Sequence, residues 1–371
     1  MTDTAADPRP DLPGRPAPIS DAVGRLAGGA PPLAEMAAAA GLRRIHMIAW
    51  RDLDDPEAGG SEVHAAHAAA SGILGRTGSG DAMVEIWNGM PFFSPLWSRC
   101  PSIVLLHHVH AEMWRMVLKP AALARVGELI EFRVAPPVYR RSRILTLSES
   151  SKAEIVELLG MHPENVDVVP PGISPRFHPG GTRSPHPLVI SVGRLVPVKR
   201  FPLLVGALVA LRARHPTLEA VIAGEGYERA ALEAQIRAGG ATSWLHLPGR
   251  VDDDDLLDLY QRAWVLSSTS LREGWGMTIT EAGACGTPSV VTDIAGHHDA
   301  VSAGRSGLLV DVNGGDALVD ALDNVIRDDG LRAALSAGAI EHAARFTWDM
   351  AARGTLDALC REARRRTRRA G

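Results

Sequence analysis

Cysteine and long hydrophobic runs are both scarce in this chain of 371 residues. The three cysteines, Cys100, Cys285 and Cys360, are widely spaced, odd in number and outside any metal-ligand pattern. They predict neither a disulfide framework nor a zinc site, and a reducing cytoplasm suits them best. The longest apolar stretch, residues 201–211, is about half as long as a membrane-spanning helix. We therefore expect a soluble, cytoplasmic protein.

An excess of basic charge is also missing. The formal net charge is −4, and no basic stripe is interleaved with aromatic residues, so the composition gives no reason to expect a nucleic-acid partner. Six arginines between Arg361 and Arg369 nevertheless crowd the end of the chain. We interpret them as a solvated, fraying helix end, and the alternative is a peripheral contact with anionic lipid headgroups.

Buried strands and helices alternate after a leader without strong patterning. Residues 1–40 are rich in Pro, Ala and Gly, so they predict a disordered or weakly helical leader and no signal peptide. Residues 41–172 follow a strand and helix rhythm that indicates a parallel sheet wrapped in helices. The expected strands lie at 43–50, 82–87, 102–108, 143–148 and 166–170, and a helix is expected at 61–76.

Four prolines and two glycines interrupt this rhythm at residues 173–187, where we place a linker between two domains. The rhythm restarts over 188–345, which predicts a second domain of the same class. Residues 346–371 follow as a C-terminal helix and basic tail. Strands are expected here at 188–193, 219–224, 244–248, 264–268, 288–293 and 307–311, and helices near 201–214, 228–238 and 254–263.

Two acids stand alone among small and apolar residues in the stretch 272–291. Gly274 and Gly276 make a helix improbable around Glu273, whereas the residues around Glu281 can begin one. Glu273 is therefore expected on a loop and Glu281 early in a helix. A lone acid is usually solvated or favours a helix dipole, but glycines beside both acids let the backbone come close to a ligand.

Two cations follow the expected strand 188–193. Open parallel sheets bind ligands beyond the carboxyl ends of their strands, so Arg194 and Lys199 are well placed to bind a diphosphate, with a solvated basic turn as the alternative. Gly224 and Gly226 also follow a strand and resemble a dinucleotide fingerprint. That fingerprint is weak, because Arg229 occupies its third glycine position.

Three histidines cluster at the end of the expected strand 102–108. His107, His108 and His110 have a spacing that fits strand alternation, but no nearby cysteine or carboxylate completes a zinc site. They are either satisfied structural residues or include one that faces a ligand cleft.

Taken together, these motifs resemble the retaining glycosyltransferases of family 4, which have the GT-B architecture of two Rossmann-like parallel-sheet domains facing across a cleft. The resemblance runs from about Ile45 to Trp348. Its most specific part is Glu273 and Glu281 separated by seven residues and followed by "CGTPSVV", with "GRLVPVK" upstream. "AGGSE", "LSESSKAEI", "AGEGYE" and "FTWDMAA" are similar to further family motifs.

The resemblance implies a hexosyltransferase that moves a sugar from a nucleoside-diphosphate sugar to a hydroxyl of a sugar, glycan or lipid-linked acceptor. It implies retention of the anomeric configuration, no metal and no cofactor. His108 and Glu273 would be catalytic, with Glu273 on the donor sugar and Glu281 on the ribose. The resemblance assigns the donor as a whole to Gly59, Gly60, Arg194, Lys199, Gly226, Glu273, Gly274, Gly276 and Glu281.

The sequence departs from the family pattern in three places. Residues 75–81, "GRTGSGD", stand where the family has further strands, so the first domain is shortened and residues 82–87 are expected to pair where a strand is missing. Pro171 replaces a usual Asn, and Asp299 replaces a common Glu. Two alternatives follow: a nucleotide-sugar-binding protein with impaired transfer, and a nicotinamide-dependent oxidoreductase, which the weak fingerprint disfavours.

Overall fold

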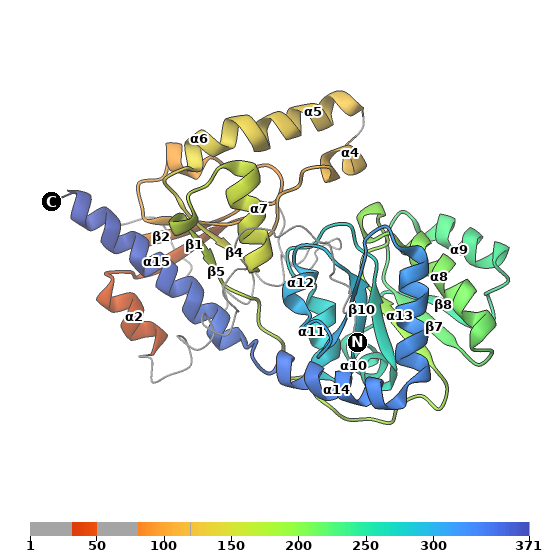
Figure 1. Ribbon diagram of the computed structural model, residues 1–371. Helices are drawn as coiled ribbons and strands as arrows, with labels where there is room; N and C mark the ends of the chain where they lie inside the picture. Colours follow the sequence, from red (N-terminus) through yellow and green to blue (C-terminus); the bar gives the residue numbers. More distant parts are fainter. Residues whose placement is uncertain (1–31, 50–80, 119, 371) are drawn as a thin grey trace, which may run out of the picture.

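The structure is a computed structural model that describes residues 32–49, 81–118 and 120–370, and these form two parallel sheets with helices packed around them (Figure 1). The first sheet has the order β1-β2-β3-β4-β5, and the second has the order β11-β10-β9-β6-β7-β8. All nine strand pairings between these elements are parallel. The predicted architecture of two Rossmann-like domains is therefore confirmed.

The first domain is built on strands whose side chains are largely buried. Residue 82 of β2 pairs directly with residue 45 of β1, so the strand that follows residues 75–81 joins the first strand of the sheet. Segment 50–80, with the expected helix 61–76, lies outside the described residues. The elements are α2 (Leu33–Ala39), β1 (Arg44–Ile48), β2 (Asp81–Ile86), β3 (Ser102–Leu105), α4 (Met113–Val117), α5 (Ala121–Leu129), a π-helical turn (Ile130–Val134), α6 (Ala135–Tyr139), β4 (Arg143–Thr146), α7 (Glu149–Leu159) and β5 (Val166–Val168), with short 3-10 turns at Ser94–Leu96 and Pro163–Asn165.

The last residues of the expected leader are helical, which is one of the two forms predicted for it. Residues 33–39 form α2, whereas residues 1–31 lie outside the described part of the chain. Helix α2 is stabilised by packing against a distant segment, which the sequence of α2 alone does not predict. It lies against the C-terminal helix α15 (Trp348–Ala370), and the Cys360 thiol donates to the Met36 carbonyl at 3.4 Å.

The second domain follows its predicted pattern closely. Helix α8 covers the predicted residues 201–214, because a run of apolar side chains there packs into the domain core behind Pro202 in the first turn. Segment 173–187 contains neither helix nor strand. The elements are β6 (Leu188–Val192), a 3-10 turn (Pro197–Lys199), α8 (Phe201–Arg214), β7 (Glu219–Ala223), α9 (Arg229–Ala238), β8 (Leu245–Gly249), α10 (Asp253–Arg262), β9 (Val265–Ser268), α11 (Met277–Ala284), β10 (Ser289–Thr292), α12 (His297–Ala300), β11 (Gly307–Val310), α13 (Gly315–Arg327) and α14 (Asp329–Ala343).

Helix α15 leaves the second domain and ends on the first (Figure 1). It packs against β3, β4 and α2, so the last helix completes the core of the first domain. Its arginines are not all solvated, which corrects our interpretation of a fraying end. Arg361 forms an ion pair with Asp167, and Arg365 and Arg366 both pair with the buried Glu362.

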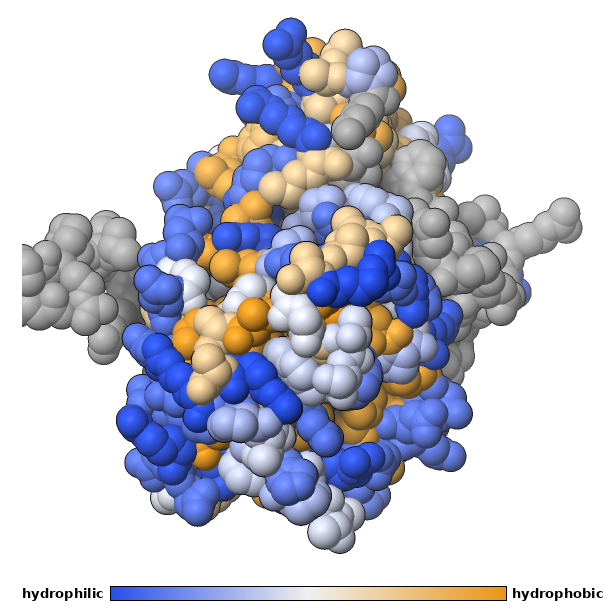
Figure 2. Space-filling model, turned by 90° about the vertical axis from the view of Figure 1, so that its right-hand side faces the viewer, coloured by the Kyte–Doolittle hydropathy of each residue, from blue (hydrophilic) through white to orange (hydrophobic). Residues whose placement is uncertain are grey.

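The surface mixes apolar and polar side chains. On the face that Figure 2 shows, hydrophobic and hydrophilic residues are interspersed, including at the upper end where α4 and α5 lie. Within the described ranges, six of the nine exposed large hydrophobic residues fall between residues 96 and 134, in the first domain. None of the helices in those ranges has the length and apolar character needed to cross a bilayer.

Candidate active site

The second sheet reverses its strand order between β6 and β9. From β6 the chain continues to β7 and β8 on one side, and from β9 it continues to β10 and β11 on the other, while β6 and β9 pair with each other. In such sheets a crevice opens where the carboxyl ends of the two central strands diverge, and ligands bind there. The predicted cations follow β6 and the predicted loop acid follows β9, so the fold brings them to one place.

Lys199 and Glu273 meet in this crevice. The Lys199 ammonium forms an ion pair with Glu273 Oε1, and the Ser270 hydroxyl donates to the same oxygen at 2.9 Å. Burial opposes ionisation of the carboxyl, but the Lys199 charge, His297 and the two hydrogen bonds together hold the pKa of Glu273 below its ordinary value. Glu273 is therefore ionised at neutral pH and fixed on a loop, as its sequence position predicted.

The glycines beside this crevice pack two loops together. A Cβ atom on Gly224 would overlap the Gly193 carbonyl, and one on Gly226 would overlap the Leu195 carbonyl. Close approach of the loops after β6 and β7 thus accounts for both glycines, and a donor contact of Gly226 stays a prediction. Arg194 lies exposed at the rim of this loop pair.

Glu281 lies in α11, on the helix that the sequence predicted for it. The Tyr260 hydroxyl donates to Glu281 Oε2 at 2.9 Å. The pKa of Glu281 is raised to about 7, because the effect of burial outweighs the Tyr260 hydrogen bond, which lowers the pKa, and the Asp253 charge adds to the rise. The two acids therefore differ in charge state near neutral pH, since Glu273 has a cationic partner and Glu281 does not.

His297 completes the group and was missed from the sequence. Its Nδ1 donates to the Thr292 carbonyl at 3.0 Å, and burial lowers its pKa to about 4, so the ring is neutral. The Glu273 charge acts on this ring, which places it beside the loop acid. The sequence does contain a pattern that indicates His297 as a site residue: "HHDAV" follows the strand 288–293, at the carboxyl end of the sheet where ligands bind.

The histidines after β3 face the second domain. Burial, then His110, His107, Arg272 and Lys199 in turn, lower the pKa of His108 well below its ordinary value. Its Nε2 is buried without a hydrogen-bond partner among the described residues, and its ring stacks on His110 with centroids 5.0 Å apart. A buried imidazole nitrogen left unpaired within electrostatic reach of Lys199 fits a ligand contact.

A buried carboxylate fixes the backbone of the loop between β3 and α4, residues 106–112, which we call the histidine loop. Glu131, in the π-helical turn after α5, accepts hydrogen bonds from the backbone N–H of His110 at 2.7 Å and of Ala111 at 3.0 Å. It also accepts one from Trp114 Nε1 at 2.9 Å. Ala111 adopts a left-handed backbone conformation with φ of 44°, which the three hydrogen bonds help to hold.

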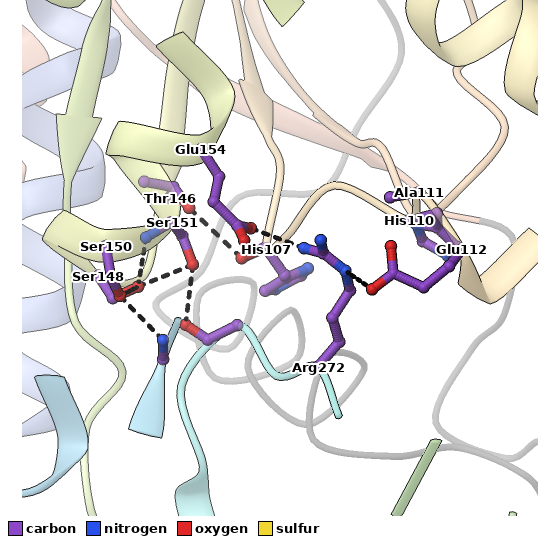
Figure 3. A network of polar contacts seen from close by, with 12 residues as sticks. His107, His110, Ala111, Glu112, Thr146, Ser148, Ser150, Ser151, Glu154 and Arg272 are labelled. Atoms are coloured by element: carbon purple, nitrogen blue, oxygen red, sulfur yellow. Dashed lines mark hydrogen bonds and ion pairs between the residues drawn. The ribbon is translucent and has the colours of Figure 1, made fainter. Parts of the chain in front are cut away.

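The two domains touch directly at this point (Figure 3). A Cβ atom on Gly274 would lie 2.6 Å from the His107 carbonyl, so this glycine permits close contact with the first domain. The Ser151 hydroxyl donates to the Gly274 carbonyl at 3.4 Å. Gly276, with φ of +105°, begins α11. The predicted donor contacts of Gly59 and Gly60 lie outside the described residues.

Within residues 32–49, 81–118 and 120–370, no group of three His, Cys, Asp or Glu side chains is arranged to hold a metal ion. The three cysteines are all unpaired, and Cys285 and Cys360 are buried.

Known proteins resemble this chain in both sequence and fold. Residues 177–342 match the family model described as glycosyl transferases group 1. A D-inositol 3-phosphate glycosyltransferase from Kribbella flavida is 34% identical over 235 residues, which are 58% of this chain and 55% of that relative. The enzyme of the same name from Acidothermus cellulolyticus is 32% identical over 68% of this chain and 61% of its own. The chain thus matches little more than half of each relative's length.

Solved structures share the fold at lower identity. Sucrose-phosphate synthase from Thermosynechococcus elongatus has a TM-score of 0.68 at 19% identity, with 91% of this chain and 92% of that chain covered. HepE from Anabaena in complex with UDP has a TM-score of 0.65 at 18% identity, with 85% and 99% covered. Residues 177–342 of this protein thus match the glycosyl transferases group 1 family, within a chain that has the GT-B fold.

Proposed function

We propose that the protein is a retaining, metal-independent glycosyltransferase that moves a sugar from a nucleoside-diphosphate sugar to an acceptor hydroxyl. The observation that carries the proposal is the ion pair between Lys199 and Glu273 at the strand-order reversal of the second sheet, within electrostatic reach of His108 and with Glu281 on the helix α11 that follows. A cation beside an ionised acid suits a donor whose phosphates and sugar lie side by side.

The residues have separate tasks in this proposal. Lys199 and Arg194 stabilise the charge that develops on the leaving nucleoside diphosphate as the bond between the anomeric carbon and the phosphate oxygen breaks. Glu273 accepts hydrogen bonds from the donor sugar, and Glu281 accepts them from the ribose. The acceptor oxygen attacks from the leaving-group face beside His108, so the anomeric configuration is retained.

The comparisons support a nucleotide donor. HepE has been solved with UDP and with UDP-glucose, which makes uridine diphosphate sugars the first donors to test. The sequence relatives are named for D-inositol 3-phosphate, so this compound belongs among the test acceptors, together with sugars, glycans and lipid-linked sugars. We propose that the protein acts in the cytoplasm. Any peripheral contact with a membrane would be made by the exposed Arg364 and Arg368 of α15.

A donor panel tests the function. The protein is incubated with UDP-, GDP- and ADP-sugars, with and without acceptors, and donor hydrolysis, product anomer and thermal shift are recorded. We expect one base to stabilise the fold and its sugar to be released or transferred with retention. Stabilisation by a donor without hydrolysis or transfer would favour the nucleotide-sugar-binding protein. Stabilisation by nicotinamide dinucleotides alone would contradict the proposal.

The ionisation of Glu281 predicts that donor affinity depends on pH. A carboxyl with a pKa of about 7 is mostly ionised at pH 8 and mostly protonated at pH 6, and the ionised form accepts ribose hydroxyls better. Affinity for the nucleoside diphosphate should therefore fall by up to about tenfold from pH 8 to pH 6. Calorimetry across this range measures the effect.

The matched control is Glu281→Gln, which has the same shape and no charge to titrate. Its affinity should be weaker at pH 8 and should lose the Glu281 part of the pH dependence. The phosphate of the ligand titrates equally with both proteins and cancels in the comparison. Parallel pH profiles for the two proteins would disprove a role of Glu281 in donor binding.

A further inference from the structure

Arg272 joins the donor loop to two elements of the first domain. It precedes Glu273 in the loop between β9 and α11, and its side chain reaches across the domain boundary (Figure 3). Its Nε donates to Glu112 Oε1 at 3.2 Å, and its Nη1 donates to Glu154 Oε2 at 2.8 Å. Glu112 is the last residue of the histidine loop, and Glu154 lies in α7. The Arg272 guanidinium therefore connects three parts of the protein: the loop between β9 and α11 that carries Glu273, which we call the donor loop, the histidine loop, and α7.

The burial of Arg272 distinguishes this contact from a surface ion pair. Its side chain is only 14% exposed, against 26% for Glu154 and 46% for Glu112. Water and salt screen exposed ion pairs, so such pairs contribute little to stability. A largely buried guanidinium is screened less, and it interacts more strongly with its carboxylate partners. The planar guanidinium also fixes the relative positions of the two acids, because its Nε and Nη1 donate to different carboxylates.

Arg272 lies between two acids of the first domain. Burial raises the pKa of Glu154, Arg272 lowers it by its charge and hydrogen bond, and Glu112 raises it again. Without Arg272, these two like-charged carboxylates would repel each other with no guanidinium between them. The histidine loop that carries Glu112 would then lose the ion pairs that join it, through Arg272, to α7 and to the donor loop.

The backbone on either side of Arg272 is held as well. The Leu271 N–H donates to the Val198 carbonyl at 2.8 Å, beside Lys199. The Gly274 carbonyl accepts from Ser151 of α7. These two contacts hold the donor loop beside Lys199 and against α7 without using the Arg272 side chain.

We propose that Arg272 is a positioning residue for sugar transfer, a role that rests on the proposed function of the same site. Through Glu112 and Glu154 it fixes the histidine loop, with His108, opposite Glu273. Arg194, Lys199 and Glu281, to which we assign most of the donor binding, lie in the second domain, so we expect donor binding to persist without the Arg272 ion pairs. Transfer requires His108 and Glu273 to be correctly placed relative to each other, because small misplacements of groups around the reacting atoms lower the reaction rate strongly.

Arg272→Ala tests the proposal against Arg305→Ala. Arg305 is a matched control, since it pairs with Glu341 on the exposed surface of the second domain, away from the first. We expect Arg272→Ala to lower kcat by about 10- to 100-fold while the Kd for UDP changes less than about twofold. Arg272→Lys keeps the charge without the fork and should fall between Ala and wild type. The double variant E112Q/E154Q should reproduce the kcat loss.

Hydrogen exchange supplies a readout that is independent of activity. In Arg272→Ala, the backbone of residues 106–113 and of α7 should exchange faster, and the core strands of the second domain should not. Unchanged exchange in these segments would overturn the proposal even if no donor reacts, which separates it from a failure of the proposed function. Equal losses of UDP affinity and kcat in Arg272→Lys would also overturn it, since Arg272 would then act on the donor itself.

Discussion

Replacing Glu273 with Gln should lower the turnover of sugar transfer by about 100-fold or more, while donor affinity changes by less than about threefold. Gln keeps the shape and can still accept from the Ser270 hydroxyl, but it removes the charge that pairs with Lys199. Contacts close to the reacting carbon matter most in the transition state, where positive charge develops on the sugar. Rapid-quench kinetics and calorimetry with the nucleoside diphosphate measure the two quantities separately.

The comparison with Glu281→Gln sharpens this expectation. Glu281 contacts Tyr260 and lies away from the Lys199 pair, so its replacement should act on donor affinity more than on turnover. The two variants differ from wild type by the same chemical change. If both lost affinity to the same degree and neither lost turnover separately, the division of roles between the acids would be wrong.

Replacing Glu131 with Ala should destabilise the first domain by about 3–5 kcal/mol. Its carboxylate is fully buried and accepts three hydrogen bonds from the histidine loop and Trp114, so the substitution leaves three N–H donors without partners. Denaturant unfolding gives the loss, and hydrogen exchange locates it in residues 81–170. Transfer activity should fall with the loop that carries His108.

Glu128→Ala is the control for Glu131. Glu128 lies on α5, one turn earlier, and forms an ion pair with the exposed Arg115. Such pairs contribute at most about 1 kcal/mol, so this variant should remain close to wild type. A loss no larger for Glu131→Ala than for Glu128→Ala would show that water replaces the buried carboxylate without cost.

Local patterns in the sequence predicted most of the strands and helices. Parallel strands that are buried on both faces read as short apolar runs, which is why β6, β7 and β9 were found close to their observed bounds. The loop position of Glu273 and the helix position of Glu281 were predicted from glycine and turn chemistry. The convergence of Lys199 and Glu273 also followed, because parallel strands end at the same edge of a sheet.

Contacts between distant segments could not be predicted in this way. The bridge from Arg272 to Glu112 and Glu154 spans 160 and 118 residues, and none of the three stands out in its own stretch. Helix α2 looked like part of a leader because the helix that packs against it, α15, comes more than 300 residues later. Periodicity reports which face of a segment is buried, and it carries no information about the partner.

Because α15 completes the first domain, the order of synthesis on the ribosome matters. Strands β3 and β4 emerge early, but α15, which packs against them, is translated only after the strands of the second domain. The second domain has its six strands in place before α15 appears, so it can fold first on the nascent chain. Until α15 docks, the apolar side chains that it covers stay open to chaperones and to other nascent chains.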